Sequence, residues 1–385
     1  MMQSLQCRDL RAEVRNPVRA YARKFQRYLP SSTPLLPITG YSGNSLTIDG
    51  ADPLDVNYKL RARISLLHAS SSAMANESTP LFTNKSTPST RATWYNYYEL
   101  TRLHKFPLGS ILVFWPSAWG LTMAAYSIQL PVRSLIIQTI MFAIGSTLLH
   151  TAACVLNDIC DRDFDRKVER TKNRPLATGV ISVSAATLWL LLFVVASVAL
   201  LATANRTAFL VGLIGVFPLH ALYPLMKRWT WWPQAWLGLA MNWGFPVAWI
   251  SVTGTLNKEI VGIFFVGTIC WTIVYDTIYG CQDVRDDAAA GVKSTSLLFG
   301  SWVRPILCIF AAVFVAAVTW AGILNHQGVS FFAISVGGTG TFFLWQFLTW
   351  KVEDVDDCGR KFEANGNMGI VLWAGMLLDY YLEVR

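Results

Sequence analysis

Long uncharged runs dominate the chain from Thr101 onward, each about the 20 residues that a helix needs to cross a bilayer. The polar turn Gly322–Gly328 divides the longest apolar run, Pro305–Trp350, into two. The pattern therefore predicts an all-α, multi-pass membrane helical bundle with nine transmembrane helices. We expect them at Ser110–Ile128, Ser134–Leu156, Ile181–Ala202, Ala208–Leu225, Pro233–Gly254, Ile260–Gly280, Pro305–Leu324, Phe331–Trp350 and Asn367–Tyr381.

The residues before these runs have a different pattern. Residues 1–97 are polar, and the Ser-, Thr- and Pro-rich stretch Ala69–Thr90 is typical of a disordered linker. Near the start, apolar residues recur at helical spacing opposite five arginines, at Leu10, Val14, Val18, Tyr21 and Phe25. This predicts a basic amphipathic helix, either a membrane-surface anchor or a mitochondrial transit peptide, and the alternative is a disordered basic tail. Asp9 and Glu13 count against the transit peptide, because such peptides contain few acids. The expected regions are 1–97 and a transmembrane domain, 98–385.

Composition and charge support a membrane protein. Of the 385 residues, 53% are hydrophobic and 15% charged, whereas soluble domains average about 25% charged. This composition excludes a soluble enzyme. The seven cysteines form no CxxC pair, so neither a disulfide framework nor a zinc site is indicated.

The basic residues are concentrated on one side of the predicted membrane. Most precede the first predicted span or follow the second, fourth, sixth and eighth, whereas the opposite loops carry only Arg133, Arg206 and Lys258. By the positive-inside rule, the N-terminus lies in the cytosol, or in the matrix if the protein is mitochondrial. Topology thus accounts for the net charge of +8, and we expect no nucleic-acid partner.

Two acidic clusters interrupt the apolar sequence, both on the basic side. The first follows the second predicted span and places Asp158, Asp161 and Asp165 on one face of a helix, at i, i+3 and i+7. The second ends the sixth span, where Asp276, Asp283 and Asp287 share a helical face at i, i+7 and i+11.

Such acids repel one another unless cations hold them, and ionisable residues next to membrane spans are usually functional. Mg²⁺ typically takes one or two carboxylates together with substrate phosphates. Two facing clusters would therefore hold ions around a diphosphate. Nearby basic residues suit its oxygens, at Arg170, Lys172, Arg174, Lys227 and Lys293.

The two clusters resemble motifs of the UbiA superfamily of intramembrane aromatic prenyltransferases. Asn157, Asp158, Asp161 and Asp165 match its NDxxDxxxD pattern. Asp283 and Asp287 match DxxxD, and Tyr223 and Lys227 match YxxxK. The resemblance covers about residues 98–385 and is closest to the 4-hydroxybenzoate polyprenyltransferases and the fungal meroterpenoid prenyltransferases.

The resemblance implies a role for each matched residue. Mg²⁺ would be the cofactor, held by Asp158, Asp161, Asp165, Asp283 and Asp287, with Asn157 adding an amide oxygen. Asn157, Arg170, Tyr223 and Lys227 would bind the diphosphate, and Asp276, Lys227 and Tyr223 would be the catalytic residues. The partners would be a prenyl diphosphate, an aromatic acceptor and the lipid bilayer; the oligomeric state stays open.

The sequence before the first span bears on the acceptor. The ubiquinone-type enzymes open this span with an RLDKP-like sequence, whereas here it reads Arg102-Leu-His-Lys-Phe-Pro107, with one extra residue before the proline. This form is more similar to the fungal enzymes that prenylate phenolic polyketides. We therefore expect transfer of a farnesyl group to a phenolic acid or polyketide in secondary metabolism, in an ER-type endomembrane.

Two alternatives stay open. One is a 4-hydroxybenzoate polyprenyltransferase of ubiquinone biosynthesis, in the mitochondrial inner membrane. The other is an ion-coupled transporter, because acids within helices also mark ion pathways. Transporters place such sites near the midplane of discontinuous helices, whereas these acids cluster at one membrane face.

Overall fold

The computed structural model describes residues 40–42, 45–47 and 92–384. The chain divides into two compact units, Met1–Ser86 and Thr87–Arg385. In the first, β1 (Gly40–Ser42) pairs antiparallel with β2 (Ser45–Thr47). The predicted amphipathic helix and linker lie outside the described residues. The second unit contains the regions that the sequence predicts to be membrane-spanning.

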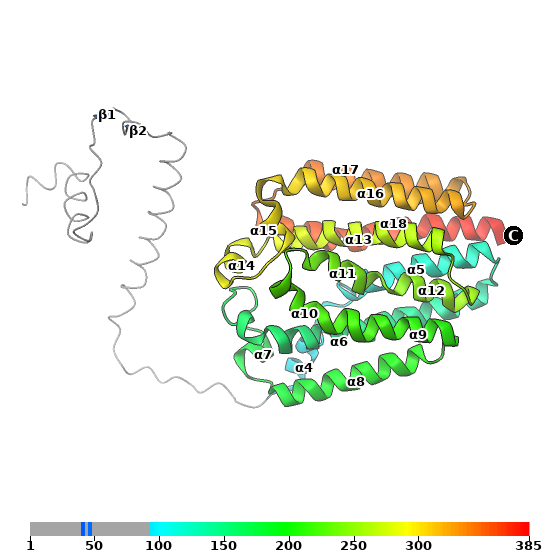
Figure 1. Cartoon of the computed structure of the whole chain (residues 1–385), viewed down its shortest axis with the longest axis horizontal. Helices are drawn as coiled ribbons and strands as arrows, with labels where there is room; N and C mark the ends of the chain where they lie inside the picture. Colours follow the sequence, from blue (N-terminus) through cyan, green and yellow to red (C-terminus); the bar gives the residue numbers. More distant parts are fainter. Residues whose placement is uncertain (1–39, 43–44, 48–91, 385) are drawn as a thin grey trace, which may run out of the picture. The chain divides into compact units, whose positions relative to one another are not determined.

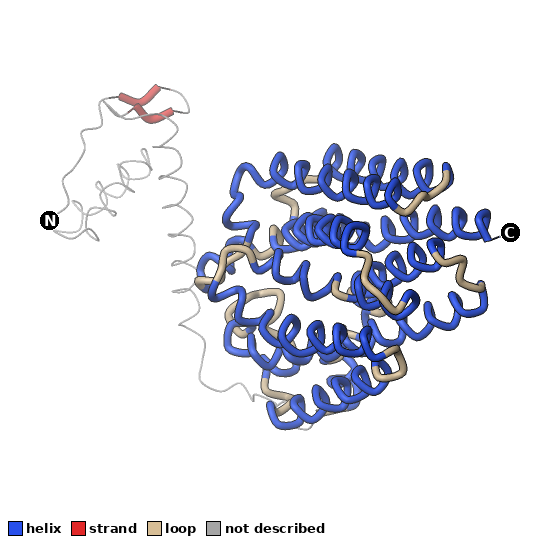
Figure 2. The backbone as a smooth tube through the Cα atoms, turned by 45° about the vertical axis from the view of Figure 1, so that its right-hand side comes forward, coloured by secondary structure: helices blue, strands red, loops and turns tan. Residues whose placement is uncertain are grey.

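The described part of the second unit is built of helices joined by short loops (Figures 1 and 2). They are α4 (Trp94–Leu100), η1 (Leu103–Lys105), α5 (Ser110–Ser127), α6 (Val132–Asp165), α7 (Pro175–Thr178), α8 (Val183–Leu201), α9 (Arg206–Ile214), η2 (Gly215–Leu219), α10 (His220–Trp229), α11 (Pro233–Asn242), α12 (Gly244–Thr253), α13 (Lys258–Gly280), α14 (Val284–Ala290), α15 (Thr295–Phe299), η3 (Gly300–Trp302), α16 (Val303–Leu324), η4 (Phe331–Val336), α17 (Gly337–Thr349) and α18 (Val355–Val384). This confirms the predicted all-α bundle.

Six of the described helices are long and apolar enough to cross a membrane, by length and composition. They are Val132–Asp165, Val183–Leu201, Arg206–Trp229, Lys258–Gly280, Thr295–Leu324 and Phe331–Thr349. Helices α5, α11 with α12, and α18 overlap the other three predicted spans. The count of nine stays a prediction.

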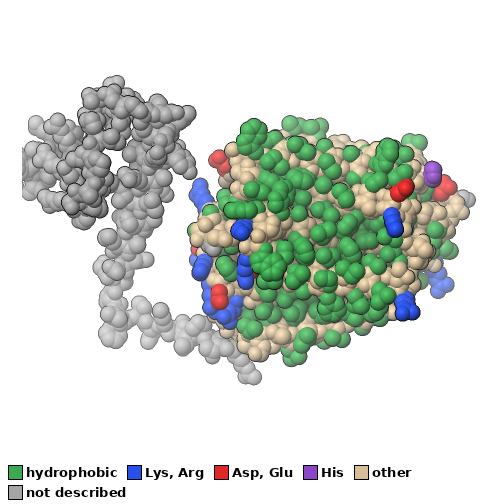
Figure 3. All heavy atoms as spheres, viewed as in Figure 1, with side chains coloured by type: hydrophobic (Ala, Val, Ile, Leu, Met, Phe, Trp, Pro, Cys, Tyr) green, Lys and Arg blue, Asp and Glu red, His purple; other side chains and the backbone are tan. Residues whose placement is uncertain are grey.

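The outside of the bundle suits a lipid environment. Large apolar side chains such as Leu188, Val195 and Leu348 are at least 65% exposed. Figure 3 shows hydrophobic side chains along the flank of the helices, with Lys and Arg gathered mainly at the end where α7 and α14 lie. Water would not favour such a surface, whereas lipid tails solvate it well.

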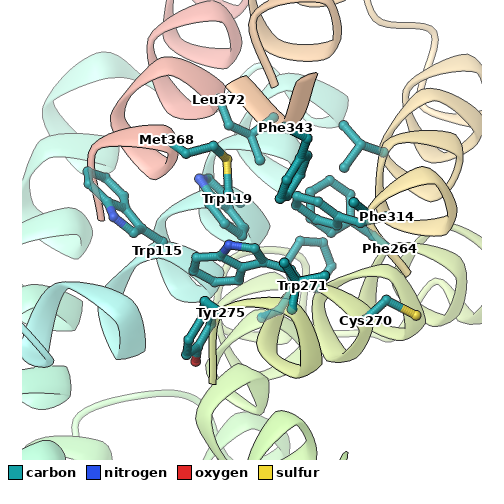
Figure 4. Packing of buried hydrophobic residues seen from close by; sticks show 14 of the residues in the cluster. Trp115, Trp119, Phe264, Cys270, Trp271, Tyr275, Phe314, Phe343, Met368 and Leu372 are labelled. Carbon is teal, nitrogen blue, oxygen red and sulfur yellow. The ribbon is translucent and has the colours of Figure 1, made fainter. Parts of the chain in front are cut away.

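The core is aromatic and joins α5, α13, α16 and α18 (Figure 4). The rings of Trp119 and Trp271 lie 5.0 Å apart, and those of Phe245 and Phe264 stack at 4.6 Å. Gly120 allows α5 to approach α12 closely, because a Cβ there would lie 2.5 Å from the Phe245 carbonyl oxygen. This packing fixes the helices whose ends form the polar site.

Candidate functional site

A cavity of about 690 Å³ opens at the basic end of the bundle. It is lined by every site residue that the sequence predicted: Asn157, Asp158, Asp161, Asp165, Arg170, Tyr223, Lys227, Asp276, Asp283 and Asp287. These residues come from α6, α10, α13, α14 and two connecting segments, separated by up to 130 positions in the chain. Folding therefore brings both acidic clusters to one place.

The first cluster lies on the last turns of α6. Asp158, Asp161 and Asp165 are buried, with 1%, 6% and 7% of their surface exposed. Asp163, on another face of the same helix, has a side chain that is 70% exposed and pairs with Arg162 and Arg166. The predicted helical face is confirmed by this difference in burial.

The second cluster departs from the predicted single helix. α13 ends at Gly280, and a turn precedes α14, which starts at Val284 with Asp283 as its N-cap. Gly280 packs closely here, because a Cβ would lie 2.7 Å from the Ser296 hydroxyl. Asp276, Asp283 and Asp287 thus reach the cavity from two helices and not from one continuous face, which corrects the periodicity argument.

Basic side chains neutralise the acids of this cavity. Arg170 Nη2 lies 2.5 Å from Asp283 Oδ2, and its Nη1 donates to the Tyr279 hydroxyl at 2.6 Å. Burial disfavours the Arg170 charge, but the hydrogen bonds to Asp283 outweigh it and raise the pKa of the guanidinium. Lys227 Nζ lies 3.4 Å from Asp161 Oδ2. Arg170 and Lys227, which were predicted to bind phosphate, therefore form ion pairs with predicted metal ligands.

Asp158 has a different environment from the other acids. Both of its oxygens accept hydrogen bonds from Arg102 Nη2, at 2.7 and 2.9 Å, and Oδ1 also accepts one from Arg174 at 3.0 Å. Arg174 in turn contacts Asp165 at 2.9 Å. Asp158 and Asp283 each accept three hydrogen bonds from arginines, so both have fewer free lone pairs for a metal than Asp161 has.

The donor set fits a hard, oxygen-seeking cation that is shared with a substrate. The Asn157 Oδ1 atom is buried without a hydrogen-bond partner and can act as a ligand. Burial raises the pKa of the Asp287 carboxyl to about 6, against the opposing effect of Lys227. Within the described ranges, no three His, Cys, Asp or Glu side chains converge closely enough to hold a metal by themselves. Phosphate oxygens would have to complete the coordination.

The residues that line the cavity differ from the predicted set in several positions. Lys172 does not line the cavity and pairs with the exposed Glu169 at 2.6 Å. Arg102, Arg228 and Tyr279 line the cavity but were not among the predicted site residues. The available signal for Arg102 and Arg228 was their position next to motif residues. A short motif alone does not show which of the neighbouring cations line the cavity.

A second cavity of about 450 Å³ extends away from the acids, along α6, α8, α9 and α12. It is mostly lined by apolar side chains and shares four residues with the first cavity: Val113, His220, Ala240 and Met241. Trp243 also lines it, whereas Trp229 and Trp231 are exposed on the surface. A charged cavity thus lies next to an apolar one.

Comparison with known proteins agrees with this arrangement. The model of the UbiA prenyltransferase family matches residues 113–373, which include both acidic clusters and the cations of α10.

Two curated relatives are similar over most of the chain. The UbiA prenyltransferase claS of Ampulloclitocybe clavipes is 46% identical over 287 residues, covering 74% of this chain and 90% of the relative. The mitochondrial 4-hydroxybenzoate polyprenyltransferase of Schizosaccharomyces pombe is 37% identical over 289 residues, covering 74% and 80%.

Solved structures share the fold. A UbiA homolog from Aeropyrum pernix K1 matches with a TM-score of 0.61 at 21% identity, over 70% of this chain and 97% of that one. A UbiA homolog from Archaeoglobus fulgidus bound to GPP and Mg²⁺ matches with a TM-score of 0.55 at 20% identity, over 74% and 99%. With the family model, the relatives and the fold in agreement, this chain belongs to the UbiA prenyltransferase family and is a transferase enzyme.

Proposed function

We propose that this enzyme transfers a farnesyl group from its diphosphate to a ring carbon of a phenolic acid or polyketide, with Mg²⁺, in meroterpenoid-type secondary metabolism. The observation that carries the proposal is one cavity lined by both acid clusters and by several cations, next to an apolar cavity. A prenyl diphosphate has the same division into a charged head and an apolar tail.

The acids and cations support a diphosphate site. Bound Mg²⁺ would neutralise the diphosphate and stabilise it as a leaving group. Asp161, Asp165, Asp283 and Asp287 supply carboxylates for it, and Asn157 supplies an amide oxygen. The Archaeoglobus structure with GPP and Mg²⁺ shows that a protein of this fold binds both.

The chain's own side chains would then act on the substrates. Lys227 and Arg170 bind diphosphate oxygens while the allylic C–O bond breaks, with Tyr223 lining the site beside them. An electron-rich ring carbon, ortho to a phenol, forms the new C–C bond, and the ring then loses its proton. Asp276 is the proposed acceptor of that proton; it also lines the cavity.

The relatives bear on the acceptor and pathway. Mitochondrial 4-hydroxybenzoate polyprenyltransferases are about 37% identical to this chain, which supports an aromatic acceptor and keeps ubiquinone synthesis as the second candidate function. The higher identity to claS and the altered sequence before α5 support the secondary-metabolite reading. We further propose an endomembrane location, with the cavity facing the cytosol.

The test is a membrane-fraction assay that crosses geranyl, farnesyl and longer prenyl diphosphates with 4-hydroxybenzoate and orsellinic-type phenolic acids. Product masses and diphosphate release are measured with Mg²⁺ and with a chelator. We expect farnesylated polyketide acid and no product with the chelator.

Other outcomes separate the alternatives. Turnover of 4-hydroxybenzoate with long tails, and not of the polyketide acid, would assign the enzyme to ubiquinone synthesis. Equal turnover with and without the chelator would contradict the proposed Mg²⁺ requirement.

A further inference from the structure

One polar side chain lies between the charged cavity and the apolar one. Four residues line both cavities and form the border between them, and three of the four are apolar: Val113, Ala240 and Met241. The fourth is His220, the first residue of α10, which is only 8% exposed. His220 therefore supplies the polar group at this border.

The backbone before His220 holds its ring in one orientation. The π-helical turn η2 ends at Leu219, and the Gly215 carbonyl accepts the backbone N–H of His220. The same carbonyl oxygen lies 2.7 Å from ring Nδ1. Gly215 is closely packed, because a Cβ there would lie 2.6 Å from Trp243 Cδ1. The ring is thus attached to a carbonyl group that has little room to move.

This contact determines which ring nitrogen carries the proton. A carbonyl oxygen only accepts hydrogen bonds, so Nδ1 of His220 is the donor. No described carboxylate acts on this buried ring, and an unpaired buried charge is unfavourable, so the ring is neutral. In a neutral imidazole that carries its proton on Nδ1, the other nitrogen, Nε2, is a hydrogen-bond acceptor.

The Nε2 atom of His220 is open to the cavity space. It has no hydrogen-bond partner among the described residues, yet it is not one of their buried polar atoms without a partner. His150, which lines the charged cavity but not the apolar one, differs in this respect. Its Nδ1 lies 3.2 Å from Ser110 Oγ, and its Nε2 lies 3.5 Å from Cys154 Sγ. His220 therefore presents an unoccupied acceptor at the border.

The border is also where the reacting carbon of a prenyl diphosphate would lie. His220, Tyr223 and Lys227 are at i, i+3 and i+7 of α10, so they share one face of the helix. In the proposed function, the diphosphate binds at Lys227 and the tail occupies the apolar cavity. The allylic carbon between head and tail then lies close to His220, and the attacking ring has to reach the same place.

We propose that His220 is a further catalytic residue, whose Nε2 accepts a hydrogen bond from the phenolic hydroxyl of the acceptor. The inference rests on the proposed function, since it assumes a phenolic acceptor at the border. The hydrogen bond orients the ring so that the carbon ortho to the hydroxyl points to the allylic carbon.

The same hydrogen bond becomes stronger during the reaction. The electron pair of the allylic C–O bond leaves with the diphosphate, and a π-electron pair of the ring forms the new C–C bond. The ring then carries positive charge, which makes its hydroxyl a better donor to Nε2. The ring proton leaves to Asp276 as proposed above, while the phenolic proton stays on oxygen, so His220 and Asp276 have separate tasks.

The first test measures binding and needs no turnover. 4-Hydroxybenzoate and benzoate share the ring and the carboxylate, but only the first has a hydroxyl group that can donate to Nε2. Their binding to the purified full chain is followed by tryptophan fluorescence. We expect the wild type to bind 4-hydroxybenzoate more tightly. H220F should lower the ratio of the two affinities about fivefold, the usual worth of one neutral hydrogen bond, and keep the affinity for benzoate.

Two further variants serve as controls for this ratio. H220Q can place its amide oxygen near the position of Nε2, so it should keep most of the wild-type ratio. H150Q changes a histidine of the same cavity whose two nitrogens already have neighbours, and it should leave the ratio unchanged. The inference is overturned if the wild type binds both compounds equally or neither of them, if H220F keeps the ratio, or if H220Q loses it as completely as H220F.

The second test is steady-state transfer from farnesyl diphosphate to the phenolic acid that the wild type accepts. H220F should lower kcat about ten- to hundredfold, since a hydrogen bond that involves a charged group is worth this much, and leave the KM for the diphosphate unchanged. A raised KM for the diphosphate with an unchanged kcat would assign His220 to tail binding and overturn the inference. If the wild type transfers no prenyl group while its binding ratio still depends on His220, the proposed function fails and the contact with the phenol stands.

Discussion

Two aspartates, Asp161 and Asp163, show at the scale of single residues how the helix divides one motif into functional and solvent-exposed positions. They are two positions apart on α6, and residues at this spacing do not share a face. Asp161 is buried and pairs with Lys227 in the cavity, whereas Asp163 pairs with Arg162 and Arg166 at the surface. The motif spacing predicted which aspartate turns inward, but not its cationic partner.

This pair gives a matched test of the proposed metal site. D161N should lower the rate of diphosphate release at least about a hundredfold, the usual cost of losing one electrostatic stabiliser. D163N removes the same charge from the same helix and should keep nearly the full rate. The assay is diphosphate release across an Mg²⁺ titration; equal losses in both variants would count against the site.

The Asp158 network makes a separate prediction about stability. R174M leaves Asp158 and Asp165 with fewer cationic partners in a buried setting, and breaking such a pair costs about 3–5 kcal/mol. R162M breaks an exposed pair with Asp163, which is worth about 1 kcal/mol or less. Thermal unfolding in detergent should separate the two variants clearly. A Tm for R174M no lower than that of R162M would contradict the network's role.

At the scale of helices, hydropathy located the membrane-facing segments well. The predicted spans Ile181–Ala202 and Pro305–Leu324 correspond to α8 (Val183–Leu201) and α16 (Val303–Leu324), within two residues at each end. Apolar length is a local property, so the sequence alone defines it. The interruptions between α11 and α12 and between α13 and α14 were not predictable from hydropathy. The ends of α13 and α11 depend on close packing against neighbouring helices, which a single sequence does not encode visibly.

The apolar cavity along α6 predicts control of tail length. Gly145 lines it, and a Cβ there would lie 3.4 Å from Leu200 Cδ2, so the larger side chain of G145F has to extend into the cavity. The rate with farnesyl diphosphate should fall about ten- to hundredfold relative to geranyl diphosphate, since small changes in apolar pockets discriminate by this factor. Competition between the two diphosphates measures the ratio. An unchanged ratio would place the tail elsewhere.

At the scale of the molecule, charge distribution predicts orientation. The loop after α6 carries Arg166, Lys167, Arg170, Lys172 and Arg174, whereas the loop between α12 and α13 contains no charge before Lys258. The positive-inside rule therefore predicts that the cavity faces the cytosol or the matrix. Long-range ion pairs such as Arg170 with Asp283 were beyond this reasoning, because they depend on how distant helices meet.

Epitope tags in sealed membranes test this orientation. A tag inserted after Lys172 should be cut by protease added to the cytosolic side of vesicles. A tag inserted after Gly254 should be protected until detergent is added. Protection of the first tag and cleavage of the second would reverse the proposed orientation.

The length of α6 has a consequence for how the reaction is driven. Its 34 residues span about 51 Å, well beyond the roughly 30 Å of bilayer hydrocarbon. If the predicted span Ser134–Leu156 lies among lipid tails, the acids Asp158 to Asp165 lie beyond it, at the boundary with water. The enzyme would then act as a phase-transfer catalyst. The diphosphate product would leave into water and the alkylated ring would partition into lipid. The two products would be separated, and the reverse reaction would be suppressed.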